Sequence, residues 1–160
     1  MSNWIEITRS YSVWDDQNIK GFFGQYRWLS NFHESEVPFD GLVFPTSEHA
    51  YQCAKTKHDS IRKLFAIHAD PILTAREAKN KGQTIPMKSN WEEIKYNTMF
   101  VIVFNKFTNC AMLRGWLKAT GNKYLEETNH WNDTYWGIDF RTGEGENNLG
   151  KILMDVRAMI

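Results

Sequence analysis

The sequence predicts an α+β fold that is mainly helical, with a small antiparallel sheet, in a single domain covering residues 1–160. Three observations lead to this prediction. Short β-favouring stretches at residues 4–8 and 41–44 lie among turn-rich segments. After residue 45, a series of capped segments with helical spacing favours helices. No repeat, low-complexity tract or Pro/Gly/Ser-rich linker interrupts the chain, so no second domain is expected.

The first three predicted helices have recognisable starts. The segment PTS at 45–47 offers a hydroxyl as N-cap for a helix that runs to about residue 57. Asp59 can cap the next helix, to about residue 69. Asp70 followed by Pro71 is typical of a cap and a first helical residue, and Gly82 is a natural end for that helix.

The segment at 91–107 can be interpreted in two ways. Its MFVIVF run alone is typical of a strand, whereas Asn90 with Glu93 three residues later resembles a capping box at a helix start. Helical spacing is kept by the larger apolar residues Trp91, Ile94, Met99 and Ile102. We therefore predict a helix.

Two more helices are predicted toward the end of the chain. Asn109 can cap a helix that continues to residue 120 and ends at Gly121. Asn148 can cap a helix through residue 159, whose inward face would consist of Ile152, Leu153, Val156 and Met159.

Composition limits the classes of partner. Nineteen basic side chains balance nineteen acidic ones, so no global field favours nonspecific binding to nucleic acid or membrane, and an anionic ligand has to be held locally. Cys53 and Cys110 lack metal-ligand or CxxC spacing, and we expect both to be reduced thiols. The first residues lack a signal-peptide pattern, so a soluble, cytoplasmic protein is expected. Seven tryptophans exceed the needs of a core this size, so some are candidates for stacking on a flat ligand.

The helix PTSEHAYQCAK carries the strongest candidate site. One face of this helix carries four functional side chains at spacings i, i+3, i+4 and i+7: Glu48, Tyr51, Gln52 and Lys55. Small alanines on the opposite face would let the helix pack tightly, holding an acid, a phenol, an amide and an amine at fixed positions.

A plainer interpretation of this helix is a solvated face on which Glu48 pairs with Lys55. Periodicity alone favours that alternative. His49 is expected to be a hydrogen-bonded core histidine, because no second histidine or carboxylate lies at metal-ligand spacing from it. No metal is therefore assigned.

A second cluster lies in NHWNDTYWG, at residues 129–137. Asp133 stands there between Trp131 and Trp136, and aromatic side chains that flank an acid suit a base-stacking wall beside a charged group. A tight turn with buried aromatic rings explains the same residues equally well.

Two weaker signals suggest phosphate contacts. In GQYRWLSNF, Arg27 lies near Asn31, and a guanidinium there could hold phosphate. In GEGENNLGK, the glycines at 143, 145 and 150 precede or begin a helix, but their spacing matches neither a dinucleotide fingerprint nor a P-loop. A flexible turn explains them at least as well.

Taken together, six segments in order resemble the NADAR family, named for a proposed link to NAD and ADP-ribose. They span residues 21–157 and comprise GQYRWLSNF, FDGLVFPTSEHAYQCAKT, AREAKNKG, KSNWEEIK, LKATGNKYLEETNHWNDTYWG and GEGENNLGKILMDVR. The resemblance implies a helix-rich α+β fold and a catalytic role for the glutamate of the SEH segment, Glu48. It also associates four other positions with the family's pocket: Lys55, Trp91, Asp133 and Trp136.

Family members include N-glycosidases that act on phosphorylated ribosylamino-pyrimidine intermediates of riboflavin synthesis and enzymes that remove ADP-ribose from guanine in DNA. Both reactions break a bond from ribose C1′ to nitrogen, and the transition state resembles an oxocarbenium ion. A carboxylate beside C1′ stabilises that charge and activates water, and Glu48 fits this role. Asp133 would orient the water or the ribose hydroxyls, while Arg27 and Lys55 would hold phosphate.

The resemblance therefore predicts an N-glycoside hydrolase that needs no cofactor and acts on a ribosyl-phosphate or ADP-ribosyl substrate, which includes ADP-ribosylated DNA. Glu48 and Asp133 are the predicted catalytic residues. The predicted substrate-binding residues are Arg27, Asn31, Gln52, Lys55, Trp91, Trp131 and Trp136. Two alternatives stay open: a noncatalytic NAD or ADP-ribose sensor, which would tolerate loss of the acid, and a toxin that consumes NAD.

Overall fold

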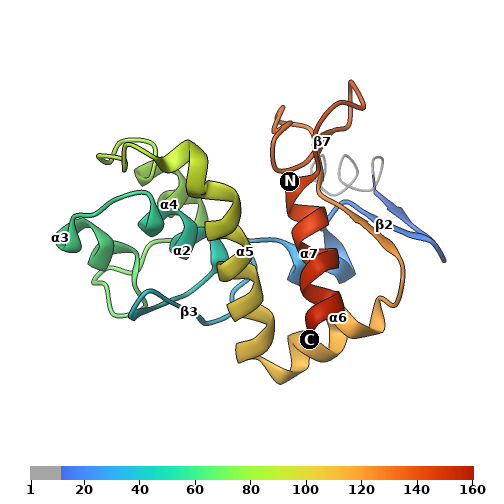
Figure 1. Ribbon diagram of the computed structural model, residues 1–160, viewed down its shortest axis with the longest axis horizontal. Helices are drawn as coiled ribbons and strands as arrows, with labels where there is room; N and C mark the ends of the chain where they lie inside the picture. Colours follow the sequence, from blue (N-terminus) through green and yellow to red (C-terminus); the bar gives the residue numbers. More distant parts are fainter. Residues whose placement is uncertain (1–11) are drawn as a thin grey trace. The chain divides into compact units, whose positions relative to one another are not determined.

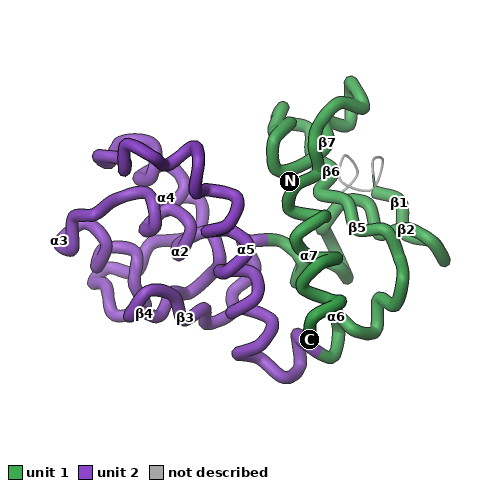
Figure 2. Tube along the Cα trace, in the orientation of Figure 1, with its two compact units in different colours: residues 1–30, 115–160 green, residues 31–114 purple. Residues whose placement is uncertain are grey.

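The computed structural model describes residues 12–160, which form two compact units (Figure 2). Unit 1 comprises the chain up to Ser30 together with Gly115–Ile160, and unit 2 comprises Asn31–Arg114. The predicted α+β class with mainly helical content is confirmed, because the elements are helices and short strands in small sheets. The single domain over residues 1–160 stays a prediction.

Unit 2 begins with a hairpin that leads into its central helix. β3 (Val37–Phe39) and β4 (Leu42–Phe44) pair antiparallel, and this confirms the strand predicted at 41–44. Asp40 and Gly41 connect the strands with positive φ angles of 47° and 79°, the backbone that tight hairpin turns require. The strand predicted at 4–8 lies outside the described residues.

The helix after this hairpin, α2 (Ser47–Ala54), lies at the centre of unit 2 (Figure 1). It begins where the PTS segment predicts, after Thr46, and ends three residues short of the predicted 57. Its neighbours are both strands of the hairpin and three other helical segments: α3 (Asp59–Arg62), α4 (Ala75–Lys81) and α5 (Trp91–Asn109), with the short η2 (Lys63–Phe65) beside them.

The predicted start of α4 is wrong. Pro71 does not open the helix, which begins four residues later after Thr74. The Thr74 hydroxyl accepts from the backbone N–H of Glu77, and the Glu77 carboxylate accepts from the backbone N–H of Thr74, so a complete capping box fixes the start there. The predicted end at Gly82 is confirmed.

Helix α5 settles the ambiguity of the MFVIVF segment in favour of helix. Its buried side chains recur every three or four residues, which only a helix places on one face, and they are Met99, Ile102, Val103, Lys106 and Phe107. Asn90 stands at the predicted start, but its side chain makes no capping hydrogen bond.

Unit 1 holds two small sheets. β1 (Val13–Trp14) pairs antiparallel with β2 (Asn18–Lys20), and β2 pairs parallel with β5 (Tyr124–Glu126). β6 (Thr128–Asn129) and β7 (Ile138–Asp139) form a parallel pair that holds the ends of the loop at 130–137.

Three helical segments complete the fold. The 3₁₀ helix η1 (Gly24–Leu29) carries the GQYRWL sequence, and α6 (Ala111–Ala119) and α7 (Asn148–Met159) correspond to the last two predicted helices. Asn148 is the first residue of α7 rather than its cap, because Asn147 precedes it in a left-handed conformation with φ 52°. In residues 12–160, no helix is both long and apolar enough to cross a membrane.

Candidate functional site

The helix that bears Glu48 is buried along its whole length. Thr46 caps it by accepting a hydrogen bond from the backbone N–H of His49, and all eight residues of α2 are buried. Glu48 is 7% exposed and Gln52 is 4% exposed. The alternative of a solvated Glu–Lys face is therefore wrong for α2. Periodicity could not show this, because the burial comes from the elements packed around the helix.

Two contacts fix Glu48 in place. Its Oε1 accepts a 2.7 Å hydrogen bond from Nε2 of Gln52, one turn further along α2. Its backbone N–H donates to the carbonyl of Asn31, 3.0 Å away, so Asn31 lies against the start of the helix. The Asn31 amide in turn lies 3.3 Å from the sulfur of Met99 on α5.

Lys55 extends the same polar cluster at the end of α2. Burial lowers the pKa of its ammonium, and the charge of Glu48 acts in the opposite direction. Its Nζ lies 5.5 Å from the ring centroid of Tyr51, whose ring packs against that of Trp91 with the centroids 5.1 Å apart. The structure therefore brings together all five residues of unit 2 that the sequence predicted for the site: Asn31, Glu48, Gln52, Lys55 and Trp91.

Trp91, predicted as a substrate-binding residue, is largely enclosed in unit 2. It is 4% exposed, and its contact with Tyr51 supports the Lys55 side of α2 from within unit 2. Its indole therefore has a packing role in the described structure, and a contact with substrate stays a prediction.

His49 has the structural role expected of it. Its Nε2 lies 2.8 Å from the carbonyl of Leu73, which only accepts, so Nε2 carries the proton and Nδ1 accepts from the hydroxyl of Thr46 at 2.8 Å. Burial lowers the pKa of this imidazole. Among residues 12–160, no group of three or more His, Cys, Asp or Glu side chains is placed to hold a metal ion. Cys53 and Cys110 are both free thiols, as predicted.

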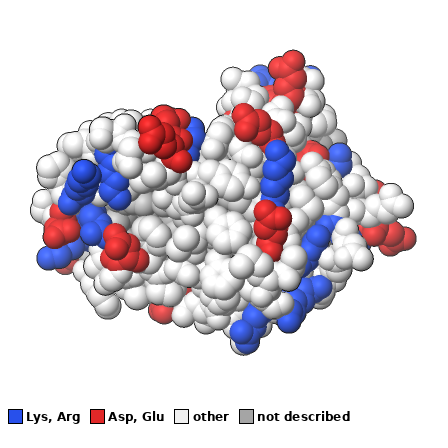
Figure 3. Space-filling model, in the orientation of Figure 1, with Lys and Arg blue, Asp and Glu red and all other residues white. Residues whose placement is uncertain are grey.

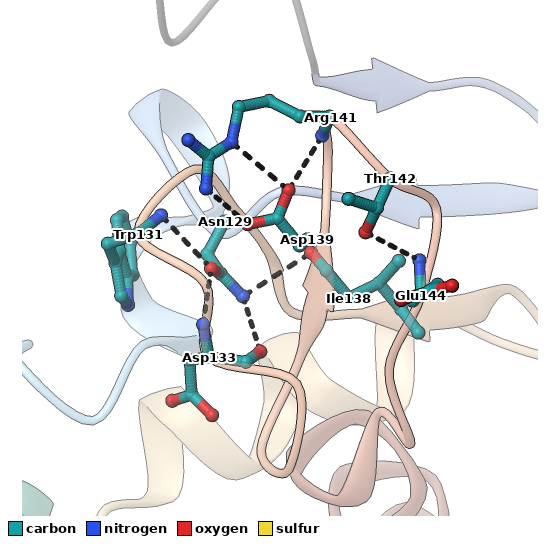
Figure 4. A network of polar contacts seen from close by, with 8 residues as sticks. All are labelled: Asn129, Trp131, Asp133, Ile138, Asp139, Arg141, Thr142 and Glu144. Atoms are coloured by element: carbon teal, nitrogen blue, oxygen red, sulfur yellow. Dashed lines mark hydrogen bonds and ion pairs between the residues drawn. The ribbon is translucent and has the colours of Figure 1, made fainter.

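The second cluster is a loop of unit 1 organised by one buried amide, Asn129 (Figure 4). Its Oδ1 accepts from the backbone N–H of Trp131 at 3.2 Å and of Asp133 at 3.0 Å. Its Nδ2 donates to the carbonyl of Asp133 at 2.8 Å and of Ile138 at 3.3 Å. Four hydrogen bonds from one fully buried side chain therefore fix the backbone around Asp133.

Asp133 itself is half-buried, and one of its oxygens is used within the loop. Oδ1 accepts a 2.9 Å hydrogen bond from the backbone N–H of Trp136, and among the described residues Oδ2 has no hydrogen-bond partner. Trp131 is 46% exposed, whereas Trp136 is half-buried against Tyr135. The tight turn that the sequence offered as an alternative is present, and it leaves the indole of Trp131 exposed.

An ion pair between a buried aspartate and an exposed arginine lies beside the same loop and was not predicted. The fully buried carboxylate of Asp139 accepts from the backbone N–H, Nε and a terminal nitrogen of Arg141. These hydrogen bonds and the charge of Arg141 lower the pKa of Asp139 to about 2. An aspartate two residues before an arginine, at the end of a short strand, is the signal that could have identified this pair.

Packing explains two of the three glycines proposed for a phosphate loop. A Cβ on Gly145 would lie 2.1 Å from the carbonyl oxygen of Gly137, and a Cβ on Gly150 would lie 2.2 Å from that of Leu125. Gly143 has φ 71° and open space around it, as expected in a turn. Arg27 lies on η1 and is exposed, so its guanidinium is available to a solvent-borne anion.

The surface charge is mixed. On the face shown in Figure 3, acidic and basic side chains are interspersed over unit 2 rather than gathered into an area of one sign. This pattern agrees with the zero net charge of the chain, and it favours local capture of a ligand over long-range attraction of a polyanion.

Comparison with known proteins gives consistent matches over nearly the whole chain. The family model of the NADAR domain matches residues 14–160. N-glycosidase YbiA of Escherichia coli K12 is 34% identical over 154 residues, which are 96% of this chain and 88% of that protein. A riboflavin biosynthesis protein of Vibrio vulnificus is 33% identical over 130 residues, which are 81% of this chain and 34% of that protein. The NMR structure of E. coli YbiA superposes with a TM-score of 0.76 at 31% identity, covering 95% of this chain and 89% of that one.

Proposed function

The chain belongs to the NADAR family and is an N-glycosidase, and on that premise we propose that it hydrolyses a ribose C1′–N bond in a phosphorylated ribosyl substrate with Glu48 as its catalytic carboxylate. The observation that carries this proposal is the state of Glu48. Glu48 is 7% exposed, on a helix that is buried along its whole length. Burying a carboxylate costs free energy, and a residue kept at that cost is a candidate for a functional role.

The chemistry follows from the charge that develops on the sugar. As the C1′–N bond breaks, its electron pair leaves with the nitrogen and positive charge spreads over C1′ and the ring oxygen. Glu48 would stabilise that charge, and its carboxylate would take a proton from the water whose oxygen bonds to C1′. The leaving nitrogen takes up one proton from solvent and Glu48 releases the proton of the water to solvent, so the carboxylate is restored and the products are the free amine or base and the ribose phosphate.

The substrate class rests on the relatives. Proteins named N-glycosidase and riboflavin biosynthesis protein both match this chain, and this supports a ribosylamino-pyrimidine phosphate as the first substrate to test. The polar cluster of unit 2 agrees with an anionic substrate, because Lys55 supplies a cation close enough to interact with Glu48. ADP-ribose linked to guanine contains the same C1′–N bond and is the second substrate to test.

We assign Asp133 a supporting role in the same reaction. Its Oδ1 accepts the hydrogen bond that fixes the turn. Its Oδ2 would accept a hydrogen bond from a ribose hydroxyl or from the attacking water. Trp131, 46% exposed, would stack on the base. Asp133→Asn tests this role separately, since it keeps the oxygen that caps the turn.

The decisive experiment compares substrates and variants side by side. The protein is incubated with the ribosylamino-pyrimidine phosphate, with ADP-ribosylated guanine DNA and with NAD, and the products are identified by mass spectrometry. Glu48→Gln should lower kcat by about 10²-fold or more while circular dichroism shows an intact fold. Glu93→Gln, the same change at an exposed position of α5, should leave kcat unchanged. A Glu48→Gln enzyme with wild-type kinetics would remove Glu48 from the mechanism.

A further inference from the structure

The stability of the fold does not explain why residue 52 is a glutamine. It is 4% exposed, and its Nε2 donates the 2.7 Å hydrogen bond to Glu48 Oε1. Its own Oε1 is buried and has no hydrogen-bond partner in the described part of the chain. An unsatisfied buried amide oxygen is costly, and an apolar side chain of similar size would avoid the cost. Within residues 12–160, the hydrogen bond to Glu48 is the only interaction of this side chain that requires an amide.

Gly82 is the second unexplained residue. It follows α4 with φ −63° and ψ −14°, a right-handed helical conformation that any residue adopts, so its backbone does not require glycine. Space does require it. A Cβ on Gly82 would lie 1.9 Å from Oε1 and 2.5 Å from Cδ of Gln52. The bare Cα of Gly82 is therefore the surface against which the Gln52 amide lies.

We infer that Gly82 and Gln52 are positioning residues for Glu48: Gly82 leaves room for one placement of the Gln52 amide, and that amide holds the Glu48 carboxylate in its reactive orientation. This inference rests on the proposed catalytic role of Glu48. It changes the role expected of Gln52 from contact with substrate to contact with the catalytic acid. It also gives Gly82 a role beyond ending a helix.

The chain of contacts predicts an unusual effect for a small substitution. In Gly82→Ala, the two closest atoms, Oε1 and Cδ of Gln52, belong to the far end of a flexible side chain, and the Cβ of Gln52 lies further away at 3.0 Å, so the Gln52 amide shifts and the fold stays intact. A catalytic group displaced by about 1 Å can lose up to about 10²-fold in rate. We expect kcat of Gly82→Ala to fall about 10-fold or more, with little change in KM, because binding does not depend on the exact direction of the carboxylate.

The matched control is Gly115→Ala. Gly115 lies within α6, and like Gly82 it can become alanine without a change of backbone conformation, but a Cβ there meets no atom within 4 Å. This variant should keep wild-type kcat and KM. An equal loss of kcat in both variants would overturn the inference, because the effect would then not come from the contact with Gln52.

A double-mutant cycle tests whether Gly82 acts through Gln52. Gln52→Ala alone should lower kcat, and adding Gly82→Ala to it should have no further effect, since the side chain that the methyl displaces is gone. Losses that multiply in the double variant would overturn the inference. So would a Gln52→Ala enzyme with wild-type kcat.

A second measurement does not depend on turnover. In ¹⁵N NMR spectra, the side-chain amide signals of Gln52 should move in both Glu48→Gln and Gly82→Ala, and stay in place in Gly115→Ala. If the signals behave in this way but the wild-type protein cleaves none of the three substrates, the contact stands and the proposed function fails. If the wild type cleaves a substrate but the Gln52 amide signals do not move in Gly82→Ala, the inference fails and the proposed function stands.

Discussion

Replacing Asn129 with alanine should destabilise unit 1 selectively. The substitution removes four hydrogen bonds from a fully buried side chain, two accepted from backbone N–H groups and two donated to backbone carbonyls. At about 0.5–1 kcal/mol for each bond, the low part of the usual range because water can reach this loop, the loss is about 2–4 kcal/mol. In a chain of this length, that corresponds to a fall in Tm of roughly 5–15 °C.

Thermal unfolding followed by circular dichroism measures this loss, and two further variants test the reasoning. Asn122→Ala makes the same change at an exposed position whose side chain makes no hydrogen bond with residues 12–160, and its Tm should stay within about 2 °C of wild type. Asn129→Asp should be about as unstable as Asn129→Ala, because an oxygen would then face the carbonyls of Asp133 and Ile138. A Tm of Asn129→Ala within 1 °C of wild type, by the scale above, would refute the view that this amide holds the loop.

Three further predictions concern ligands, metals and pH. Arg27→Ala and Lys55→Ala should each raise KM for a phosphorylated substrate more than they lower kcat, because phosphate is held in the ground state and the transition state alike; unchanged affinity in calorimetry for both would move the phosphate site elsewhere. Activity should persist in excess EDTA, and a loss that magnesium or manganese restores would contradict the carboxylate mechanism. Burial lowers the pKa of His49 in the folded protein below its ordinary value of 6.5, so on acidification the unfolded state takes up the proton first. The free energy of unfolding should therefore fall as the pH drops below 6.5. An NMR titration of His49 with a midpoint at or above 6.5 would contradict this.

Local patterns predicted those parts of the fold that depend on neighbouring residues in the chain. The start of α2, the helical course of α5 and the end of α4 at Gly82 all follow from caps and spacing. The start of α4 was misplaced because two capping signals compete within a few residues, the aspartate before Pro71 and the Thr74–Glu77 box. Only the second makes both reciprocal hydrogen bonds.

The candidate site divides in the same way. Helical periodicity placed Glu48, Gln52 and Lys55 together, and the structure keeps them together. Periodicity could not show that this face is buried, since burial depends on segments far away in the sequence. Asn129 was missed for a related reason: all four of its partners are backbone groups, which every residue possesses, so no side-chain pattern marks it.

The interior of α2 indicates how unit 2 tolerates a buried acid. Two buried polar atoms without a hydrogen-bond partner among the described residues, Ser47 Oγ and Gln52 Oε1, belong to this one helix and flank Glu48 along it. Each costs about 1–3 kcal/mol, so a helix selected for stability alone would carry apolar side chains at these positions. The cost has to be offset by apolar burial on the elements that surround α2, such as Phe44 and Ile102, both fully buried. The central place of α2 in unit 2 is consistent with the role proposed for Glu48, because a position enclosed on several sides offers both the rigidity that a catalytic carboxylate needs and the apolar contacts that offset its cost.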